Sequence, residues 1–320
     1  MRKIVCGLLS LLVFVACVRI NPQDGDIIAL TVILQSNNEY VGRIALVNYS
    51  TGELIKYVTS NNDNARKAHF SPDKKKLLIE FSTGGTPSEF GVYDIESDSL
   101  SKFQMNGYDG QIYSVIGNQP IWNSSSNGFY YSINYKNIYY YDFTTQNFTT
   151  IHQDNNIDND VYCIDLMSDD SLIVFSNKYY RENNDSNCIF IMSPTGEYLS
   201  QITNPHFELI NKDGITVKGA SYLNWNSSTR RFIYSAIDSS YSGFKISVTD
   251  YNGTFNEEYT DLFYDKLPIW GPQDIIFFHR PNEEYDEDEA YVLDTKTRKV
   301  SKLSDKIQIS RAVFLSDPTY

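Results

Sequence analysis

The sequence predicts an all-β fold, a six-bladed β-propeller whose blades are four-stranded antiparallel sheets. Two short sequence patterns alternate along the 320 residues, and each pattern predicts a pair of strands. The key residues of the first pattern recur at a mean spacing of about 49 residues, within the ~40–50 residue period of propeller blades. An aromatic content of 14% also favours strands, because aromatic side chains pack well on a pleated surface.

The first pattern is an apolar or aromatic residue, then a polar turn, then a short apolar run. It predicts the innermost strand of a blade, a tight turn and the second strand. The six key residues are Phe70, Trp122, Met167, Trp225, Trp270 and Phe314. We expect these side chains to be wedged between neighbouring blades, because a repeat unit cannot bury its face alone. The alternative is an aromatic platform for a sugar.

The second pattern is a four-residue β-type run that ends in Asp, Asn or Ser. The six terminal residues are Asn48, Asp94, Asp142, Ser193, Asp250 and Asp294. Their side chains bond backbone groups two residues on, which starts a tight turn. Residues suited to a positive φ follow in three copies, at Thr51-Gly52, Thr195-Gly196 and Asn252-Gly253. The pattern therefore predicts the third and fourth strands of each blade.

The two ends of the chain predict how the ring closes. Residues 27–34 form a second strand with no innermost strand before it. Residues 312–316 form an innermost strand with no second strand after it. Pairing of these two segments would complete the sixth blade. It would also remove an open sheet edge, which otherwise invites aggregation.

One turn of the first pattern carries a family resemblance. The segment Ser71-Pro72-Asp73-Lys74-Lys75-Lys76 resembles the Ser-Pro-Asp-Gly-Lys repeat of TolB-type β-propellers, and Pro-Ile-Trp at 120–122 and 268–270 resembles the start of that repeat. The resemblance covers residues 26–320 and implies the same propeller fold. Only one copy keeps Ser-Pro-Asp, and none has Gly after it. TolB itself has an additional N-terminal domain, for which residues 17–25 are too few, so we infer no TolB-type role in envelope division.

The N-terminus predicts an export signal in residues 1–16. Basic Arg2 and Lys3 precede an apolar stretch that is too short to span a membrane stably. Ala16 before Cys17 resembles a bacterial lipobox, in which the Cys carries the lipid. The alternative is an ordinary signal peptide with an incidental Cys. We expect lipid on Cys17, a short linker over 17–25 and the propeller over 26–320.

These features predict a lipid-anchored protein of the bacterial cell envelope, in the periplasm or at the cell surface, with the outer membrane favoured. No later apolar stretch reaches the ~20 residues that a spanning helix needs, so the lipid would be the only membrane attachment. Asp and Glu number 40 and Lys and Arg number 27, which gives a net charge of −13. This charge disfavours binding to nucleic acid phosphates. We expect a monomer.

The search for catalytic motifs favours a non-catalytic protein. The sequence contains no Gly-x-Ser-x-Gly nucleophile motif and no His-Glu-x-x-His zinc motif. Lyases on related propellers use a histidine and metal cluster in the central channel. The histidines here are scattered through different repeats, at His69, His152, His206 and His279. A polysaccharide lyase or glycoside hydrolase, which needs converging titratable side chains, stays as the alternative.

One acidic segment has the spacing of a calcium loop. Asp154, Asn156, Asp158 and Asp160 place oxygen donors at alternate positions, and Ca²⁺ takes about six to eight oxygen ligands. The position that is Gly in an EF-hand loop is Asn159 here. A calcium site is one interpretation, and a solvated polar loop is the other. We expect no other cofactor.

Loop length gives the functional prediction. In a four-stranded meander, the turns after the first and third strands share one face, and the other connections share the opposite face. The long connections all belong to the second class, at 107–118, 178–187, 204–218 and 280–289. Binding residues concentrate in long loops on rigid scaffolds, and Tyr and Arg are favoured anchors. The candidate ligand residues are Tyr108, Tyr113, Tyr179, Tyr180, Arg181 and Tyr285.

The favoured function is therefore non-catalytic binding of an envelope protein or a glycan through the long-loop face. A purely structural envelope scaffold is a third interpretation.

We also expect Cys163 and Cys188 to be free thiols, although an exported compartment permits a disulfide. Cys163 falls in the first strand of its blade and Cys188 at the start of the third. The second strand lies between them, which separates their backbones by about 9.5 Å. A disulfide tolerates at most about 7 Å between Cα atoms.

Overall fold

The structure is a computed structural model. It describes residues 27–36, 39–81, 89–104, 120–133, 137–153, 161–166, 171–179, 186–202, 208–210, 216–218, 220–226, 229–237, 244–250, 256–260, 264–271, 274–281, 288–305 and 313–314. These residues form six four-stranded antiparallel sheets and one two-stranded sheet. Five of the four-stranded sheets consist of consecutive strands, whereas one joins the last strand of the chain to the first three.

We number the four-stranded sheets in chain order and give their strands from the first, innermost strand outward. Sheet 1 consists of β26 (Val313–Phe314), β1 (Ile27–Ser36), β2 (Glu39–Asn48) and β3 (Leu54–Tyr57). Sheet 2 consists of β4 (Ala65–Phe70), β5 (Lys76–Phe81), β6 (Glu89–Asp94) and β7 (Ser99–Gln104). Sheet 3 consists of β8 (Ile121–Trp122), β9 (Gly128–Ile133), β10 (Asn137–Asp142) and β11 (Asn147–Gln153).

Sheets 4 to 6 follow the same pattern. Sheet 4 consists of β12 (Val161–Leu166), β13 (Leu172–Tyr179), β14 (Ser186–Met192) and β15 (Tyr198–Ile202). Sheet 5 consists of β18 (Ala220–Asn226), β19 (Arg231–Ile237), β20 (Phe244–Asp250) and β21 (Asn256–Glu258). Sheet 6 consists of β22 (Lys266–Trp270), β23 (Ile275–Pro281), β24 (Asp288–Asp294) and β25 (Val300–Lys302), which is followed by the 3₁₀ helix η3 (Leu303–Asp305).

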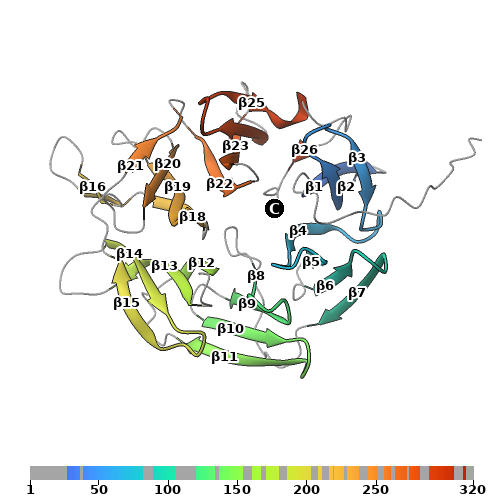
Figure 1. Cartoon of the computed structure of the whole chain (residues 1–320), viewed down its shortest axis with the longest axis horizontal. Coiled ribbons are helices and arrows are strands. Elements are labelled where there is room, and N and C mark those ends of the chain that lie inside the picture. Colours follow the sequence, from blue (N-terminus) through green and yellow to red (C-terminus); the bar gives the residue numbers. More distant parts are fainter. Residues whose placement is uncertain are drawn as a thin grey trace, which may run out of the picture.

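The sheets are arranged around a common centre, as Figure 1 shows, with their first strands nearest to it. The prediction of an all-β propeller with four-stranded antiparallel blades is therefore confirmed. Among the described residues, no helix has the length and apolar composition to cross a membrane.

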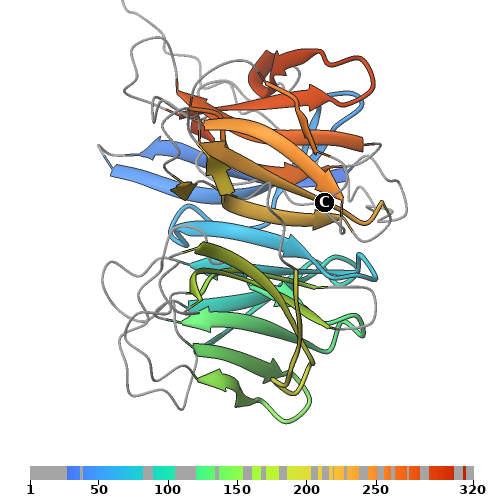
Figure 2. The ribbon, with the colours of Figure 1, turned by 90° about the vertical axis from the view of Figure 1, so that its left-hand side faces the viewer.

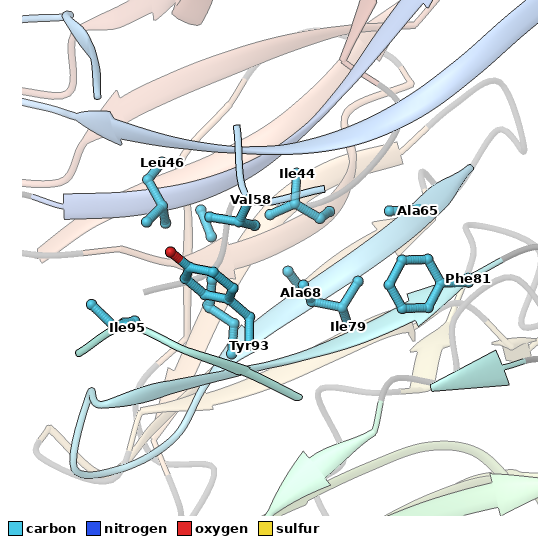
Figure 3. Close-up of a cluster of buried hydrophobic side chains, with 11 residues drawn as sticks. Ile44, Leu46, Val58, Ala65, Ala68, Ile79, Phe81, Tyr93 and Ile95 are labelled. Carbon is cyan, nitrogen blue, oxygen red and sulfur yellow. The ribbon is translucent and has the colours of Figure 1, made fainter. Parts of the chain in front are cut away.

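Apolar clusters between neighbouring sheets form the core. Between sheets 1 and 2, Ile44 and Leu46 pack against Ile79, Phe81 and the other residues of one cluster, all of them buried (Figure 3). Similar clusters join sheets 2 and 3, sheets 3 and 4, sheets 5 and 6, and sheets 6 and 1. Sheets 4 and 5 are in contact through β12 and β18. Sheets 1, 2, 3 and 6 thus bury apolar side chains on both faces, as the repeat requires.

Two of the aromatic key residues of the first pattern, Trp122 and Trp270, are buried members of these clusters. Trp122 is buried between sheets 2 and 3, and its Nε1 donates a hydrogen bond to the His69 carbonyl over 2.9 Å. Trp270 is buried between sheets 5 and 6. Both tryptophans wedge between sheets, as predicted, and neither is a platform open to a sugar.

The turns after the third strands begin as the second pattern predicts. The Asp94 carboxylate accepts a hydrogen bond from the Ser97 backbone N–H over 2.8 Å, and the Asp294 carboxylate accepts bonds from Lys296 and Thr297 over 2.8 and 2.9 Å. These backbone donors hold the pKa of each carboxyl below its ordinary value, against a small opposing effect of burial. A residue with positive φ ends these turns, at Gly52, Asp98, Gln146, Gly196 and Arg298.

Sheet 1 is composite, as the two chain ends predicted. β26 pairs antiparallel with β1 through Val32 with Phe314 and Ile33 with Val313. The two clusters on sheet 1 hold it against both neighbours: Ile28 and Leu30 pack toward sheet 6, and Ala29 packs toward sheet 2.

Two features were not predicted. The connection at 204–218 contains a small antiparallel hairpin of β16 (Glu208–Ile210) and β17 (Thr216–Lys218). In addition, β1 and β2 form a hairpin of ten paired residues on each strand, whereas β5 and β6 pair over six.

The register of sheet 4 leads us to expect two free cysteine thiols. Cys163 pairs with Phe175 of β13, and Cys188 pairs with Ser176 of the same strand, on its other edge. A whole strand therefore separates the two cysteines, which exceeds the reach of a disulfide. Thiol titration of the unfolded, unreduced mature chain with Cys17 replaced should count both thiols. A Cys163–Cys188 bridge in a non-reducing peptide map would show that this register is wrong.

Candidate functional site

The sheets present two different faces, which Figure 2 shows from the side. The short-turn face carries the turns after the first and third strands of each sheet, such as 71–75 and 95–98. The long-loop face carries the connections after the second strands and those between sheets. Any ligand site in the long connections belongs to this second face.

Most residues predicted for ligand binding lie outside the described residues. Tyr179 is the last residue of β13, which runs from the short-turn face and ends at the long-loop face. The other predicted residues are outside the described ranges, namely Cys17, Tyr108, Tyr113, Tyr180, Arg181 and Tyr285 and the calcium candidates Asp154, Asn156, Asp158 and Asp160. Their roles stay predictions.

A buried ion pair lies on the long-loop face of sheet 6. Asp265 stands just before β22, and Arg280 lies near the end of β23, so both are at this end of the sheet. The Arg280 Nε and Nη2 atoms donate to the two carboxylate oxygens of Asp265 over 2.7 and 2.9 Å. The Asp265 side chain is fully buried. Burial raises the pKa of this carboxyl, and hydrogen bonds from Arg280 and Thr260 oppose the rise.

Aromatic rings hold the Arg280 guanidinium from the sides. Its central carbon lies 4.9 Å from the centre of the Tyr291 ring and 5.3 Å from that of Phe278. The neighbouring Glu289 accepts a hydrogen bond from the Tyr291 hydroxyl and from Lys302. Because a bidentate pair and two rings fix the guanidinium, this corner of the long-loop face is rigid.

Tyr264 stands directly before this ion pair and is exposed. Its side chain retains 40% of its accessible surface, although large apolar residues of the described chain are otherwise exposed only at Leu199. Its backbone φ is +78°, a left-handed conformation that tyrosine rarely adopts. Such a conformation costs about 1–3 kcal/mol and persists only where the surroundings impose it. The next residue, Asp265, is fully buried in its pair with Arg280.

Buried polar side chains also recur at equivalent positions of the second strands. Four side chains, each at most 2% exposed, occupy the same position in their sheets: Thr31, Glu80, Ser235 and His279. Each is paired with the third-strand residue that lies four positions before the Asp or Asn at the end of that strand. We call these four residues the polar ring. The first strands beside them have irregular register, for example between Ala65 and Lys67. Thr31 Oγ1 donates to the carbonyl of Arg66 inside that irregularity over 2.8 Å. This contact satisfies a backbone group that the bulge removes from the ladder.

The titratable members of the polar ring face different interfaces. Glu80 shares a strand face with Leu78, which packs toward sheet 3, and it raises the pKa of buried Tyr131 there beyond the effect of burial itself. His279 shares a strand face with Phe277, which packs toward sheet 1.

A second buried histidine, His69, is uncharged at neutral pH, because burial and then Lys67 lower its pKa to about 3. In the described part of the chain, no group of three or more His, Cys, Asp or Glu side chains has the arrangement of a metal site.

Comparisons with known proteins agree with this architecture. No family model and no curated protein sequence matches the chain. Among solved structures, TolB from Acinetobacter baumannii superposes with a TM-score of 0.58 and 16% identity, over 85% of this chain and 62% of that one. This chain thus spans less than two thirds of that TolB.

The likeness is one of fold.

Two further structures cover most of both chains. The putative TolB from Agrobacterium tumefaciens has a TM-score of 0.57 and 15% identity, over 86% of this chain and 88% of that one. An oligogalacturonate lyase from Vibrio parahaemolyticus has a TM-score of 0.51 and 15% identity, over 87% and 85%. At these identities the similarity shows that this chain shares the propeller architecture, and it gives no information about its activity.

Proposed function

We propose that the protein is a non-catalytic binding propeller of the bacterial cell envelope, lipid-anchored at Cys17, that binds a protein or a glycan through its long-loop face. The exposed and strained Tyr264, next to the buried Asp265–Arg280 pair, is the observation that carries this proposal. Backbone strain of this kind clusters at ligand contacts, and tyrosine is a favoured anchor of interfaces. The predicted tyrosines and Arg181 belong to connections on the same face.

Binding is tested with the mature chain as bait for ligands in envelope extracts. Protease digestion of the extract abolishes capture of a protein ligand, and periodate oxidation abolishes capture of a glycan. We expect Tyr264→Ala to weaken binding of the captured ligand at least ~30-fold, the effect of losing about 2 kcal/mol at an interface anchor. Leu199→Ala is the matched control, because among the described residues it removes the other exposed large apolar side chain, from the outer strand of sheet 4. Equal affinities for the two variants would contradict the proposal.

A polysaccharide lyase or glycoside hydrolase remains the second candidate. The fold likeness to an oligogalacturonate lyase and the buried titratable side chains of Glu80 and His279 are what favour it. Release of unsaturated or reducing sugar ends from envelope and plant polysaccharides is the measurement that distinguishes it from pure binding. Turnover of any polymer would replace the non-catalytic proposal.

We further propose that composite sheet 1 is the closing blade of a six-bladed ring. Deletion of residues 311–320 removes β26, so the edge of β1 that faces away from β2 has no partner strand. We expect this truncation to aggregate or to lose its cooperative thermal transition, because an unpaired edge templates association. Deletion of 317–320 keeps β26 and is the control. A monomeric 311–320 deletion with an unchanged melting transition would contradict closure.

A further inference from the structure

We infer that the short-turn face lies against the membrane and that the long-loop face points away from it, which rests on the proposed lipid at Cys17. The first described residue, Ile27, pairs with Asn48, and Asn48 begins the short turn at 49–53. The chain therefore enters sheet 1 at the short-turn face. The linker from the lipid arrives at this same face.

The linker is too short to reach around the molecule. Cys17 and Ile27 are ten positions apart. Even fully extended, ten residues span at most about 36 Å. A path along the outer edge of sheet 1 has to pass two strand spacings, about 10 Å, and then the height of β1, about 30 Å for a strand of its length. A path through the centre meets β26, which lies beside β1.

The long hairpin of sheet 1 is taller than the linker can pass. β1 and β2 are paired over ten residues each, so sheet 1 is tallest where the linker begins. A lipid on Cys17 cannot pass beyond the long-loop end of this hairpin. The lipid can therefore insert only into a bilayer that lies next to the short-turn face.

Tyr264 and the Asp265–Arg280 pair lie on the long-loop face, so in this orientation they point away from the membrane, where a partner can reach them.

Orientation is tested on the mature chain carrying Cys163→Ser and Cys188→Ser, coupled through Cys17 to a maleimide lipid. The vesicles contain phosphatidylcholine and phosphatidylglycerol with an acceptor dye on a fraction of the headgroups. Azidophenylalanine for a donor dye replaces one exposed residue at a time. Lys75 and Thr145 report the short-turn face, and Asn62 and Asp305 report the long-loop face.

We expect energy transfer from positions 75 and 145 to be at least about twice that from positions 62 and 305, because the height of a strand of six to ten residues separates the two faces. Equal or reversed transfer overturns the inference. The chemical tether makes this result independent of lipidation in cells. Lipidation is tested separately by membrane fractionation of Cys17→Ser, whose failure to change fractionation would contradict the anchor and not the geometry.

Discussion

Replacement of Asp265 by Ala is expected to lower the free energy of unfolding by about 3–5 kcal/mol, the cost of leaving a buried charge without its partner. The Arg280 side chain is only 16% exposed and would be left beside the rings of Phe278 and Tyr291 without its carboxylate partner. Urea unfolding followed by tyrosine and tryptophan fluorescence measures the change as a shift in midpoint at constant slope.

The matched control lies in the same sheet. Glu289→Ala removes a partner of Lys302, but the side chains of Lys302 and Glu289 are 35% and 27% exposed. Water can replace the lost contact, so we expect a change below about 1 kcal/mol. If Asp265→Ala and Glu289→Ala are equally mild, the Asp265–Arg280 pair does not stabilise sheet 6 as its burial implies.

Replacement of Gly42 by Ala is expected to destabilise the fold by about 3 kcal/mol, the upper end for overpacking a core. A Cβ at position 42 would clash with the carbonyl oxygen of Ala65, which belongs to the first strand of sheet 2. That oxygen is a backbone atom, so relief requires β2 and β4 to move apart. The loss is measured as a fall in the urea midpoint.

Gly91→Ala is the control for this steric argument. The Cβ at position 91 would come within 2.9 Å of the Phe81 ring and 3.0 Å of Leu100, both of which are side chains that can rotate. We expect a loss of about 1 kcal/mol, the lower end for overpacking. A Gly42→Ala protein as stable as Gly91→Ala would mean that the close approach of sheets 1 and 2 is not maintained in solution.

Local chemistry explains why so much of the fold was predictable. Asp94 and Asp294 direct their turns through bonds to residues two or three positions away, and a sequence pattern captures contacts of that range. The burial of Trp122 and Trp270 followed from repetition, since equivalent positions in a ring meet equivalent neighbours. The length of the β1–β2 hairpin and the β16–β17 hairpin interrupt the repeat, and a periodic argument cannot detect them.

The candidate site was harder to predict, because it depends on register between strands. Asp265 and Arg280 are 15 positions apart and meet because Lys266 pairs with His279 on the adjacent rung. A one-residue change in that pairing would move them apart. Lys74 and Tyr264 hold left-handed backbones without being glycine, and no residue type in the sequence signals this. The predicted loop tyrosines rest on connection length alone.

The composite sheet also determines the order in which the sheets can form while the chain is synthesised. β1 appears first among the described strands and β26 last, whereas each of the other four-stranded sheets has all its strands within one short stretch. Those sheets can form one after another before synthesis is complete. Sheet 1 has to wait for a contact that spans almost the full sequence, and contacts of such separation form slowly. The interval between the synthesis of β1 and that of β26 is therefore the stage at which the chain depends most on protection from its surroundings.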